Sequence, residues 1–272
     1  MVDLSELVPT YITAIPKDPS ATTTDHAGYR VIKTGNQIGL SAPAELGQVI
    51  TIGNIPTWTP ISGLVAHYLM NDNLATTAVL DNTGAHNGTA TANTSAMSTV
   101  GKTSTAFVFT NSNYVNIGNA NTFGIYNGLS LSAWIFVADF NGAIYGTTMI
   151  GSDGGTQPVS WDAYNGTYQR FFINGGAGGF FTSNTSYSVN TWYHVAVTYD
   201  SSGNGVFYKN GLPDGTFSGG SMPSGSASLL IGHRQNGNTI YGKIDDFRVY
   251  DRVLSSTEIT QLYNSGSGTE AE

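Results

Sequence analysis

The stretch "GKIDDFRVYDRVLSSTEITQLYN" (residues 242–264) joins the two kinds of secondary structure that this chain encodes. Apolar residues alternating from Ile244 to Tyr250 predict a buried strand. After it, Ser255 or Ser256 can cap a short helix over "STEITQLYN", with Glu258 in its first turn. The strand also contains two consecutive carboxylates, which a buried strand rarely carries.

The two consecutive carboxylates are Asp245 and Asp246, and side-chain alternation predicts different surroundings for them. Asp245 has the parity of the apolar Phe247 and Val249, so we expect it to point into the protein. An unpaired charge there would cost about several kcal/mol, so Asp245 needs a partner. Asp246 shares the parity of Arg248, and we expect it to face outward and pair with a nearby cation.

From Ile61 onward, the chain is a series of short apolar segments separated by turn residues. Gly is abundant (34 of 272 residues), 11% of residues are aromatic and only 10% are charged, a mixture that suits many strands. Short strands without helical patterns between them indicate an all-β sandwich or jelly roll. The expected strands are Leu64–Met70, Ala106–Phe109, Tyr114–Ile117, Leu129–Val137, Gly146–Ile150, Arg170–Ile173, Trp192–Tyr199, Gly205–Lys209, Ser228–Gly232 and Ile244–Tyr250.

Six blocks of this region follow one another in a distinctive order and spacing. They are "GLVAHYLMND" to "AVLDNTGAHNGTATA" (63–92), "AFVFTNSNYVNIG" (106–118), "GLSLSAWIFV" (128–137), "NTWYHVAVTYDSSGNGVFYKNG" (190–211), "LLIGHR" (229–234) and "GKIDDFRVYDRVLSSTEITQLYN" (242–264). Together they resemble the laminin-G-like, concanavalin A-like lectin and glucanase superfamily over about residues 61–264. The resemblance implies a concanavalin A-like jelly roll sandwich of two antiparallel sheets with a short C-terminal helix.

The same resemblance implies a structural Ca²⁺ ion. In jelly rolls of this superfamily the Asp at the place of Asp245, three residues before Arg248, often binds Ca²⁺ together with oxygens of an early loop. Asp81 would be the second carboxylate and Asp72 a third, with carbonyl groups near residues 111–113; such oxygens are the ligands that Ca²⁺ prefers. An alternative that needs no metal is that Asp245 accepts hydrogen bonds from loop amides.

Residues 1–60 differ in composition from the rest of the chain, since they hold six of the nine prolines. Two short strands, Tyr29–Lys33 and Gln37–Ala42, flank "TGN" and predict a small hairpin. The order "LVPTYITAIPKDP", then a hairpin ending in "LSAPAELG", resembles the C-terminal part of type IV pilins and pseudopilins over about residues 1–50. We therefore expect an N-terminal hairpin unit and linker (1–60) before the jelly roll (61–272); a generic β-rich linker is the alternative.

Charge and composition restrict the partners. The formal net charge is −8 with only ten Lys and Arg, which leaves no basic stripe for phosphates, so we expect neither nucleic acid nor membrane as a partner. The absence of cysteine excludes disulfides, thiolate metal sites and cysteine catalysis. No apolar run approaches the about 18–20 residues that span a bilayer. We expect the protein outside the cell or on its surface, with any export signal upstream of residue 1.

Carboxylates for catalysis are scarce. Glycosidases on this jelly roll usually work with two or three carboxylates, commonly Glu, about 5–9 Å apart. The chain has five Glu, and none lies between residues 46 and 257. The Asp residues of that region lie in turns such as "GSDGG" and "LPDGT", where turn chemistry explains them. We therefore expect no catalytic residues and predict that the chain is not an enzyme.

Three loops instead carry the rings and amides that suit carbohydrate recognition: "SWDAYNGTYQR" (160–170), "FFTSNTSY" (180–187) and "GHRQNGNTIYG" (232–242). For each ring, covering a strand is the alternative. We expect His194, in "TWYHVAVTYD", to be a packing residue and not a catalytic base. The candidate ligand-binding residues are Trp161, Tyr164, Tyr168, Arg170, His233, Arg234 and Tyr241.

The leading hypothesis is a non-catalytic, extracellular glycan-binding or adhesion module of a cell-surface or pilus-associated protein. Its partners would be a glycan or polysaccharide and other subunits of a surface filament. One alternative is a structural domain that decorates such a filament and has no small ligand. Another is a polysaccharide hydrolase or lyase with an Asp-based site that includes Asp153 or Asp162.

Overall fold

The structure of the protein is a computed structural model. It describes residues 30–34, 37–41, 60–110, 113–125, 127–139, 147–152, 159–164, 168–173, 180–221, 226–234 and 238–270. The chain divides into two compact units, residues 1–60 and 61–272. In the first unit, β1 (Arg30–Thr34) and β2 (Gln37–Ser41) form the predicted antiparallel hairpin. The rest of the pilin-like segment lies outside the described residues.

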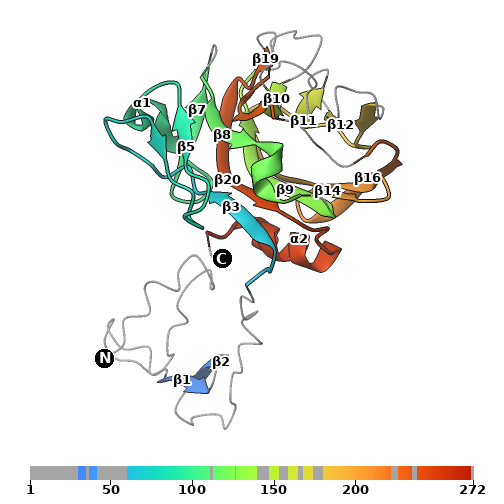
Figure 1. The fold of residues 1–272 in the computed structure, drawn as a ribbon. Helices are drawn as coiled ribbons and strands as arrows, with labels where there is room; N and C mark the ends of the chain where they lie inside the picture. The colour runs from blue at the N-terminus through green and yellow to red at the C-terminus, as the bar shows by residue number, and fades with distance from the viewer. Residues whose placement is uncertain are drawn as a thin grey trace. The chain divides into compact units, whose positions relative to one another are not determined.

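The second unit contains two large antiparallel sheets (Figure 1). The first, here the β20 sheet, also includes β3 (Leu64–Tyr68), which pairs with β20. Its remaining strands, in spatial order, are β16 (Leu212–Ser218), β15 (Asn204–Lys209), β14 (Trp192–Asp200), β9 (Gly128–Val137), β20 (Gly242–Tyr250), β7 (Thr105–Phe109) and β6 (Ser98–Val100).

The second, here the β11 sheet, has eight strands. Their spatial order is β13 (Phe180–Thr182), β12 (Tyr168–Ile173), β11 (Val159–Tyr164), β10 (Thr147–Ser152), β17 (Ser228–Ile231), β8 (Val115–Asn119), β5 (Gly88–Ala90) and β4 (Ala78–Val79). The smaller elements are the pair β18 (His233–Arg234) and β19 (Asn238–Thr239), the helices α1 (Thr94–Met97) and α2 (Ser256–Tyr263), and the 3-10 turns η2 (Ala120–Phe123) and η4 (Asn264–Gly266).

One hydrophobic core lies between the two sheets. Leu131 and Ile135 of β9 belong to the same buried cluster as Trp161 and Phe171 of the β11 sheet. Burial of each such side chain contributes about 1.5–3 kcal/mol, which is the main driving force for stacking the sheets. The expectation of an all-β jelly roll sandwich of two antiparallel sheets is therefore confirmed.

The predicted C-terminal helix is confirmed and its cap is assigned. Ser255 is the N-cap: its hydroxyl accepts from the Glu258 N–H (3.3 Å), and the Glu258 carboxylate accepts from the Ser255 N–H (2.8 Å). The helix buries Ile259 and Leu262. In Figure 1, α2 lies across β9 and β14 on the side away from β10–β12, so it covers the outer face of the β20 sheet.

A bulge in β20 overturns the predicted orientation of its two carboxylates. The pairing with β9 runs from Asp245 opposite Trp134 to Arg248 opposite Ser132, so β20 has one extra residue between these pairs. Asp246 has a φ of 51°, in the left-handed region that Asp tolerates better than most residues. The extra residue resets the alternation. Asp245 consequently lies on the side of Trp134, opposite to the core residue Phe247. Asp246 is only 2% exposed, but it pairs with a nearby cation, Arg248, as expected.

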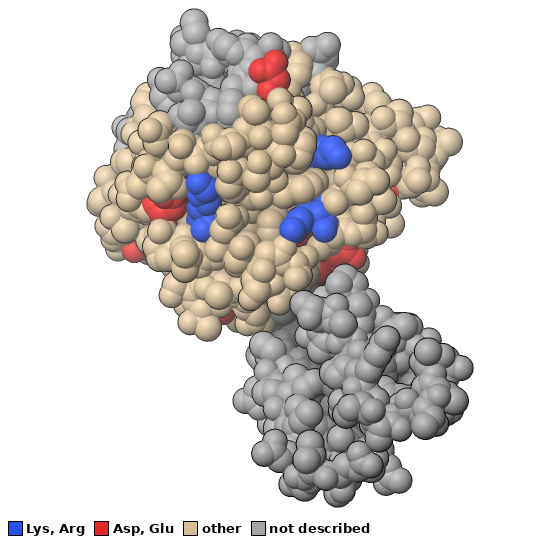
Figure 2. Space-filling view, turned by 180° about the vertical axis from the view of Figure 1, so that it is seen from behind, with Lys and Arg blue, Asp and Glu red and all other residues tan. Residues whose placement is uncertain are grey.

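No helix of the described residues is long and apolar enough to cross a membrane. Figure 2 shows that the Lys and Arg residues described on one face of the molecule are separated by uncharged surface. That face therefore has no continuous basic area among its described residues, in line with the net charge of −8.

Candidate functional site

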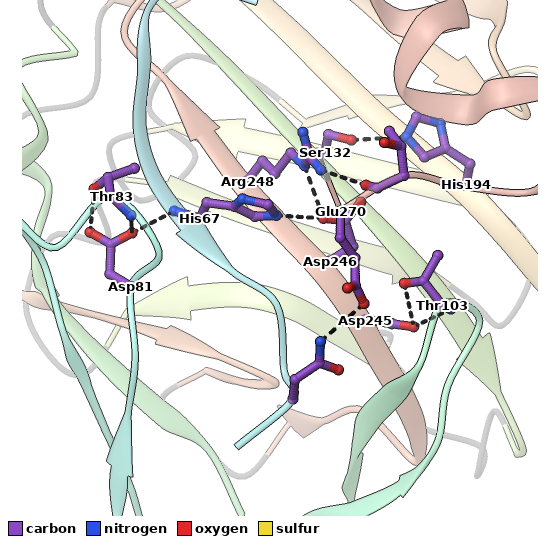
Figure 3. Close-up of polar contacts among 12 residues, drawn as sticks. His67, Asp81, Thr83, Thr103, Ser132, His194, Asp245, Asp246, Arg248 and Glu270 are labelled. Carbon is purple, nitrogen blue, oxygen red and sulfur yellow. Dashed lines mark hydrogen bonds and ion pairs between the residues drawn. The ribbon is translucent and has the colours of Figure 1, made fainter. Parts of the chain in front are cut away.

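Asp245 is held by loop amides, which was the metal-free alternative. Its Oδ2 accepts from the N–H groups of Lys102 (2.7 Å) and Thr103 (2.9 Å), as Figure 3 shows for Thr103. Its Oδ1 is buried and has no hydrogen-bond partner. Burial raises the pKa of Asp245 to about 7, although the two amides oppose the shift. The negative charges of Asp246 and Glu270 contribute to the same shift.

Asp246 is the centre of a buried network, here the β20 network of His67, Asp246 and Arg248 (Figure 3). Asp246 Oδ1 is 2.6 Å from His67 Nε2 and accepts from Arg248 Nε at 2.9 Å. Arg248 Nη2 donates to the carbonyl of Thr269 (2.5 Å). Burial opposes the charged guanidinium, but Asp246 beside it raises the pKa of Arg248. The network ties β3, β20 and the C-terminal segment together.

Asp81 is fully engaged by the chain itself. Its carboxylate accepts from the N–H groups of His67 (2.7 Å), Thr83 (3.1 Å), Ala85 (3.2 Å) and His86 (2.8 Å), and from the Thr83 hydroxyl (2.6 Å). Burial alone would raise the pKa of Asp81, but these hydrogen bonds hold it below its ordinary value. N–H donors therefore occupy the lone pairs that a cation would need.

The carboxylates expected to bind Ca²⁺ do not fit one shared site. Asp72 accepts from the Leu80 N–H, while Asp81 and Asp245 are bonded to separate sets of amides. Among the described residues no three His, Asp or Glu side chains are grouped closely enough to hold a metal ion. Calcium binding therefore stays a prediction from the resemblance.

His194 has the surroundings of a packing residue, as expected. It is 1% exposed, its Nε2 lies 2.9 Å from the Ser132 hydroxyl, and its ring meets the edge of Trp134 at 5.4 Å. Burial lowers the pKa of His194 to about 3, so the imidazole is neutral at physiological pH. A buried, neutral imidazole under α2 is not placed to act on a substrate.

A second group of buried charges lies on the outer face of the β11 sheet. Asp162 of β11 stands directly opposite Arg170 of β12. Its Oδ2 accepts from Arg170 Nη2 and, at 3.4 Å, from Arg234 Nη1, while its Oδ1 accepts from the Ser160 hydroxyl (2.9 Å). The charged side chains are at most 9% exposed. Trp161 and Phe171, with the opposite parity, point into the core.

Aromatic rings flank these charges. The Arg170 guanidinium carbon is 5.4 Å from the Phe172 ring and 5.7 Å from the Phe180 ring, and that of Arg234 is 5.3 Å from Phe172. Phe180 is 63% exposed, so the group reaches the surface. Asp162, Arg170, Arg234, Phe172 and Phe180 are here named the Asp162 cluster. It offers a carboxylate, guanidinium donors and apolar ring faces in one place, a combination that suits a polar organic ligand.

The structure brings only some of the predicted ligand-binding residues together. Arg170 and Arg234 converge on Asp162, and Tyr168, at the start of β12, is 38% exposed. His233 stacks on Tyr114 (5.3 Å) and is half-buried, as is Tyr241. The side chain of Tyr164 lies outside the described residues.

The expectation for Trp161 is wrong. Its ring has no exposed surface and belongs to the core, where its indole N–H donates to Gln169 (3.1 Å). The segment was interpreted as a loop, but Val159–Tyr164 is a strand, so alternate side chains face opposite sides. Interpreting the segment as a strand would have placed Asp162 on the face opposite to Trp161, away from the core. Phe172 and Phe180 lie on the two neighbouring strands.

Comparisons with known proteins place this architecture. A family model described as the concanavalin A-like lectin/glucanases superfamily matches residues 109–260, more than half of the chain. No curated protein matches. A Trypanosoma rangeli sialidase in complex with 2,3-difluorosialic acid has 18% sequence identity and a TM-score of 0.58. The match covers 78% of this chain and 35% of the sialidase, so the chain spans about a third of that protein.

Two other similar structures are single domains. Domain 4 of a GH43 extracellular arabinanase from Geobacillus stearothermophilus, in complex with arabinotriose, is 20% identical with a TM-score of 0.56. The match covers 72% of this chain and 96% of that domain. The receptor binding domain of botulinum neurotoxin C/D mosaic serotype is 16% identical, with a TM-score of 0.56 and coverage of 74% and 51%. At these identities the likeness shows the fold.

The comparisons correct the expectation that the chain is not an enzyme. That expectation was drawn from the absence of Glu between residues 46 and 257. Two of the similar structures, a sialidase and one domain of an arabinanase, come from glycan-active enzymes, so the exclusion of an enzyme is wrong as drawn. The expectation that the Asp residues of this region lie in turns is also wrong for Asp162, which lies within a strand and is buried between two arginines.

Proposed function

The chain belongs to the concanavalin A-like lectin/glucanase superfamily, and on that premise we propose that its jelly roll binds glycans through the Asp162 cluster. The observation that carries the proposal is a buried carboxylate between two arginines on the sheet face that points away from the core. Burying such charges is expensive, and the β11 sheet already has an apolar face that packs the sandwich. Binding of a ligand on the outer face would explain why these charges are kept there.

The chemistry of the cluster suits sugars. Hydroxyl groups accept hydrogen bonds from guanidinium groups and donate them to carboxylates, while the apolar faces of a sugar ring lie against aromatic rings. Arg170 and Arg234, which Asp162 holds in place, supply the polar part, and the exposed ring of Phe180 supplies the apolar part. The arginines are oriented by Asp162 and packed on Phe172, so the site is preorganised.

The similar structures support a saccharide as ligand. The arabinanase domain is in complex with arabinotriose, and the same sialidase is also known in complex with sialic acid. These ligands belong to those proteins; for this chain they guide the choice of probes. We further propose that the protein acts outside the cell, where polysaccharide or surface glycan is its partner. Membership of a pilus or other surface filament rests on the pilin-like resemblance of residues 1–50 alone.

A second candidate function is hydrolysis or lysis of a glycan by an Asp-based site. The favouring observation is that Asp162, one of the two Asp residues considered for this role, lies within strand β11 beside Arg170 and Arg234, next to the exposed ring of Phe180. Asp153 lies outside the described residues. Release of reducing ends or unsaturated sugars from a polysaccharide, abolished by Asp162→Asn, would support catalysis. Binding without any release would leave recognition as the function.

The test of glycan binding is affinity electrophoresis against neutral and acidic polysaccharides, followed by a glycan array. Arg170→Lys keeps the charge but loses the planar two-pronged donor, and we expect it to weaken retention by about tenfold or more. Arg252→Lys is the matched control, because Arg252 is an arginine paired with Glu258 on another part of the surface. Absence of retention on any glycan, with both proteins folded, would overturn the proposal.

A further inference from the structure

A groove of about 430 Å³ lies where the chain passes from β3 to β4. Its size is in the range of small-ligand sites. It adjoins β4, the last strand of the β11 sheet, whereas the Asp162 cluster lies on β11 and β12 at the other end of the same sheet. The lining includes Asn71, Asp72, Asn73, Leu74, Leu80 and Asn82.

One wall of the groove is fixed by side-chain hydrogen bonds. The Asp72 carboxylate accepts from the Leu80 N–H at 3.2 and 3.3 Å, which closes the connection between β3 and β4. The Leu74 N–H donates to the Thr94 hydroxyl (3.0 Å), which anchors the same connection to α1. The wall is therefore preformed, so a ligand would not need to order it.

The other wall is fixed by Asn71. Its Oδ1 accepts from the N–H (3.1 Å) and hydroxyl (2.9 Å) of Thr105, and its Nδ2 donates to Glu270 (3.0 Å). The preceding residue, Met70, is buried with a φ of 58°. A left-handed conformation costs a non-glycine residue about 1–2 kcal/mol. The surrounding packing sustains this cost, and the chain turns sharply into the groove.

The chemistry of the lining selects a class of ligand. Asp72 is half-buried, and burial raises its pKa, although the N–H groups of Leu80 and of Asp72 itself oppose the shift. The contacts from Leu80 are long, at 3.2 and 3.3 Å, so the carboxylate keeps lone pairs for a hydroxyl donor. Asn73 is exposed beside it, and Leu74 and Leu80 are 57% and 58% exposed. The described lining contains neither Lys nor Arg. A ligand with hydroxyl groups, apolar C–H faces and no negative charge matches this set.

A second groove lacks these properties. It has a volume of about 500 Å³ and lies over Thr198, Asp200 and Thr216. The Asp200 carboxylate there already accepts from the N–H groups of Ser202 (2.9 Å) and Asn204 (2.8 Å) and from the Asn204 side chain (3.2 Å). The turn after Asp200 therefore already supplies hydrogen-bond donors to this carboxylate, which leaves fewer acceptor positions for a ligand than Asp72 does.

We propose that the groove at Asp72 is a second saccharide site, selective for neutral sugars, in which Asp72 and Asn73 bind hydroxyls and Leu74 and Leu80 cover a C–H face. The proposal deepens glycan binding and rests on it. Two sites at opposite ends of one sheet would let a single polysaccharide chain bind twice. Long chains would then be retained more strongly than trisaccharides, because the second contact is intramolecular.

The test is a calorimetric and NMR titration of the whole chain with arabinotriose, maltotriose and the corresponding polysaccharides. The groove variant Asn73→Ala/Leu80→Ala alters exposed side chains, so it should fold with little loss of stability. We expect it to lose about tenfold or more in affinity for a neutral trisaccharide. Leu212→Ala is the matched control, because Leu212 is 67% exposed on β16 and should leave affinity unchanged.

Asp162→Asn separates this proposal from the proposed function. If Asp162→Asn abolishes all binding and the groove variant changes nothing, the groove is not a site and the Asp162 cluster alone binds glycan. If the groove variant loses neutral trisaccharide binding that Asp162→Asn retains, the second site is supported. If neutral and acidic glycans all fail to bind the wild-type protein, both proposals are overturned.

Discussion

The β20 network and the Asp162 cluster both bury an aspartate beside arginine, yet they are built differently. The β20 network joins segments far apart in sequence: Asp246 contacts His67, 179 residues away, and Arg248 holds the carbonyl of Thr269. The Asp162 cluster joins Asp162 to Arg170 on the adjacent strand, 8 residues away, and reaches the surface at Phe180. The first cross-links the fold; the second presents charges on one face of a sheet.

The comparison shows that a buried charge is not by itself a sign of function. In the β20 network, backbone and side-chain groups of the chain supply the partners, so the arrangement is explained by stability and specificity of the fold. In the Asp162 cluster, the charges sit beside an exposed aromatic ring on a face that the core does not use. The same kind of substitution made in each group can therefore show which group holds the fold together and which one serves a ligand.

The largest expected effect comes from removing the arginine of each group. Arg248→Met leaves Asp246 buried without its strongest partner and should lower the free energy of unfolding by about 3–5 kcal/mol. Arg170→Met should lower it by less than half as much, because Arg234 still faces Asp162. Urea denaturation measures both. Equal losses would mean that the Asp162 cluster also serves mainly to hold the fold.

The next effect concerns acid. The folded-state pKa of His194 is about 3, below the ordinary value of 6.5. Above pH 6.5 the imidazole is neutral in both the folded and the unfolded state, so it does not change the free energy of unfolding. As pH falls from 6.5 toward 3, only the unfolded state takes up the proton, and the free energy of unfolding falls by about 1.4 kcal/mol per pH unit. Between pH 6.5 and 4 this amounts to about 3 kcal/mol. His194→Gln should remove that dependence in thermal melts; an unchanged slope would contradict it.

Asp245 should act in the opposite direction over nearly the same range. Its folded-state pKa is about 7, above the ordinary 3.8, so the ionised form is disfavoured and stability falls as pH rises from 4 to 7. Relative to wild type, Asp245→Asn should become more favourable by about 2–3 kcal/mol between pH 5 and pH 8. Melting curves at the two pH values test this, with Asp200→Asn as control, because Asp200 lies at the end of β14 and hydrogen bonds lower its pKa, so it does not titrate in this range.

The sequence predicted the fold of this protein better than it predicted the buried polar groups. The strands β9, β14 and β20 and the Ser255 cap depend on residues close in sequence, and the structure confirms that these elements form. The parity of Asp245 failed because Asp246 adopts a positive φ in a bulge. That choice is made by pairing with β9 and contact with His67, which no local pattern contains.

The Asp162 cluster was missed for a related reason. Its members come from β11, β12, β13 and β18, and the sequence predicted a turn for Asp162, as for the other Asp residues of the region. Only strand register brings Asp162 opposite Arg170 and Phe172 opposite Phe180. The residue types of these segments predicted a polar and aromatic surface that suits a ligand. Which side chains point to that surface depends on the pairing register of the strands, and the sequence alone does not give this register.

The smallest effect is expected for a third ion pair, which gives the surface baseline for the comparison. Arg252 Nη2 donates to Glu258 Oε1 (2.5 Å), and both side chains are partly exposed, at 32% and 25%. The hydrogen bond from Arg252 lowers the pKa of Glu258 to about 2, against an ordinary 4.5. Its stabilisation is therefore present above pH 4.5 and lost as pH falls toward 2.

Glu258→Gln isolates this pair, because glutamine can replace glutamate in the capping box with Ser255. We expect a loss of about 1 kcal/mol or less at pH 7, shrinking at high salt because exposed charges are screened. Arg248→Met should be insensitive to salt, since its partners are buried. A loss for Glu258→Gln as large and as salt-independent as that for Arg248→Met would mean that burial does not separate fold-holding charges from surface ones in this protein.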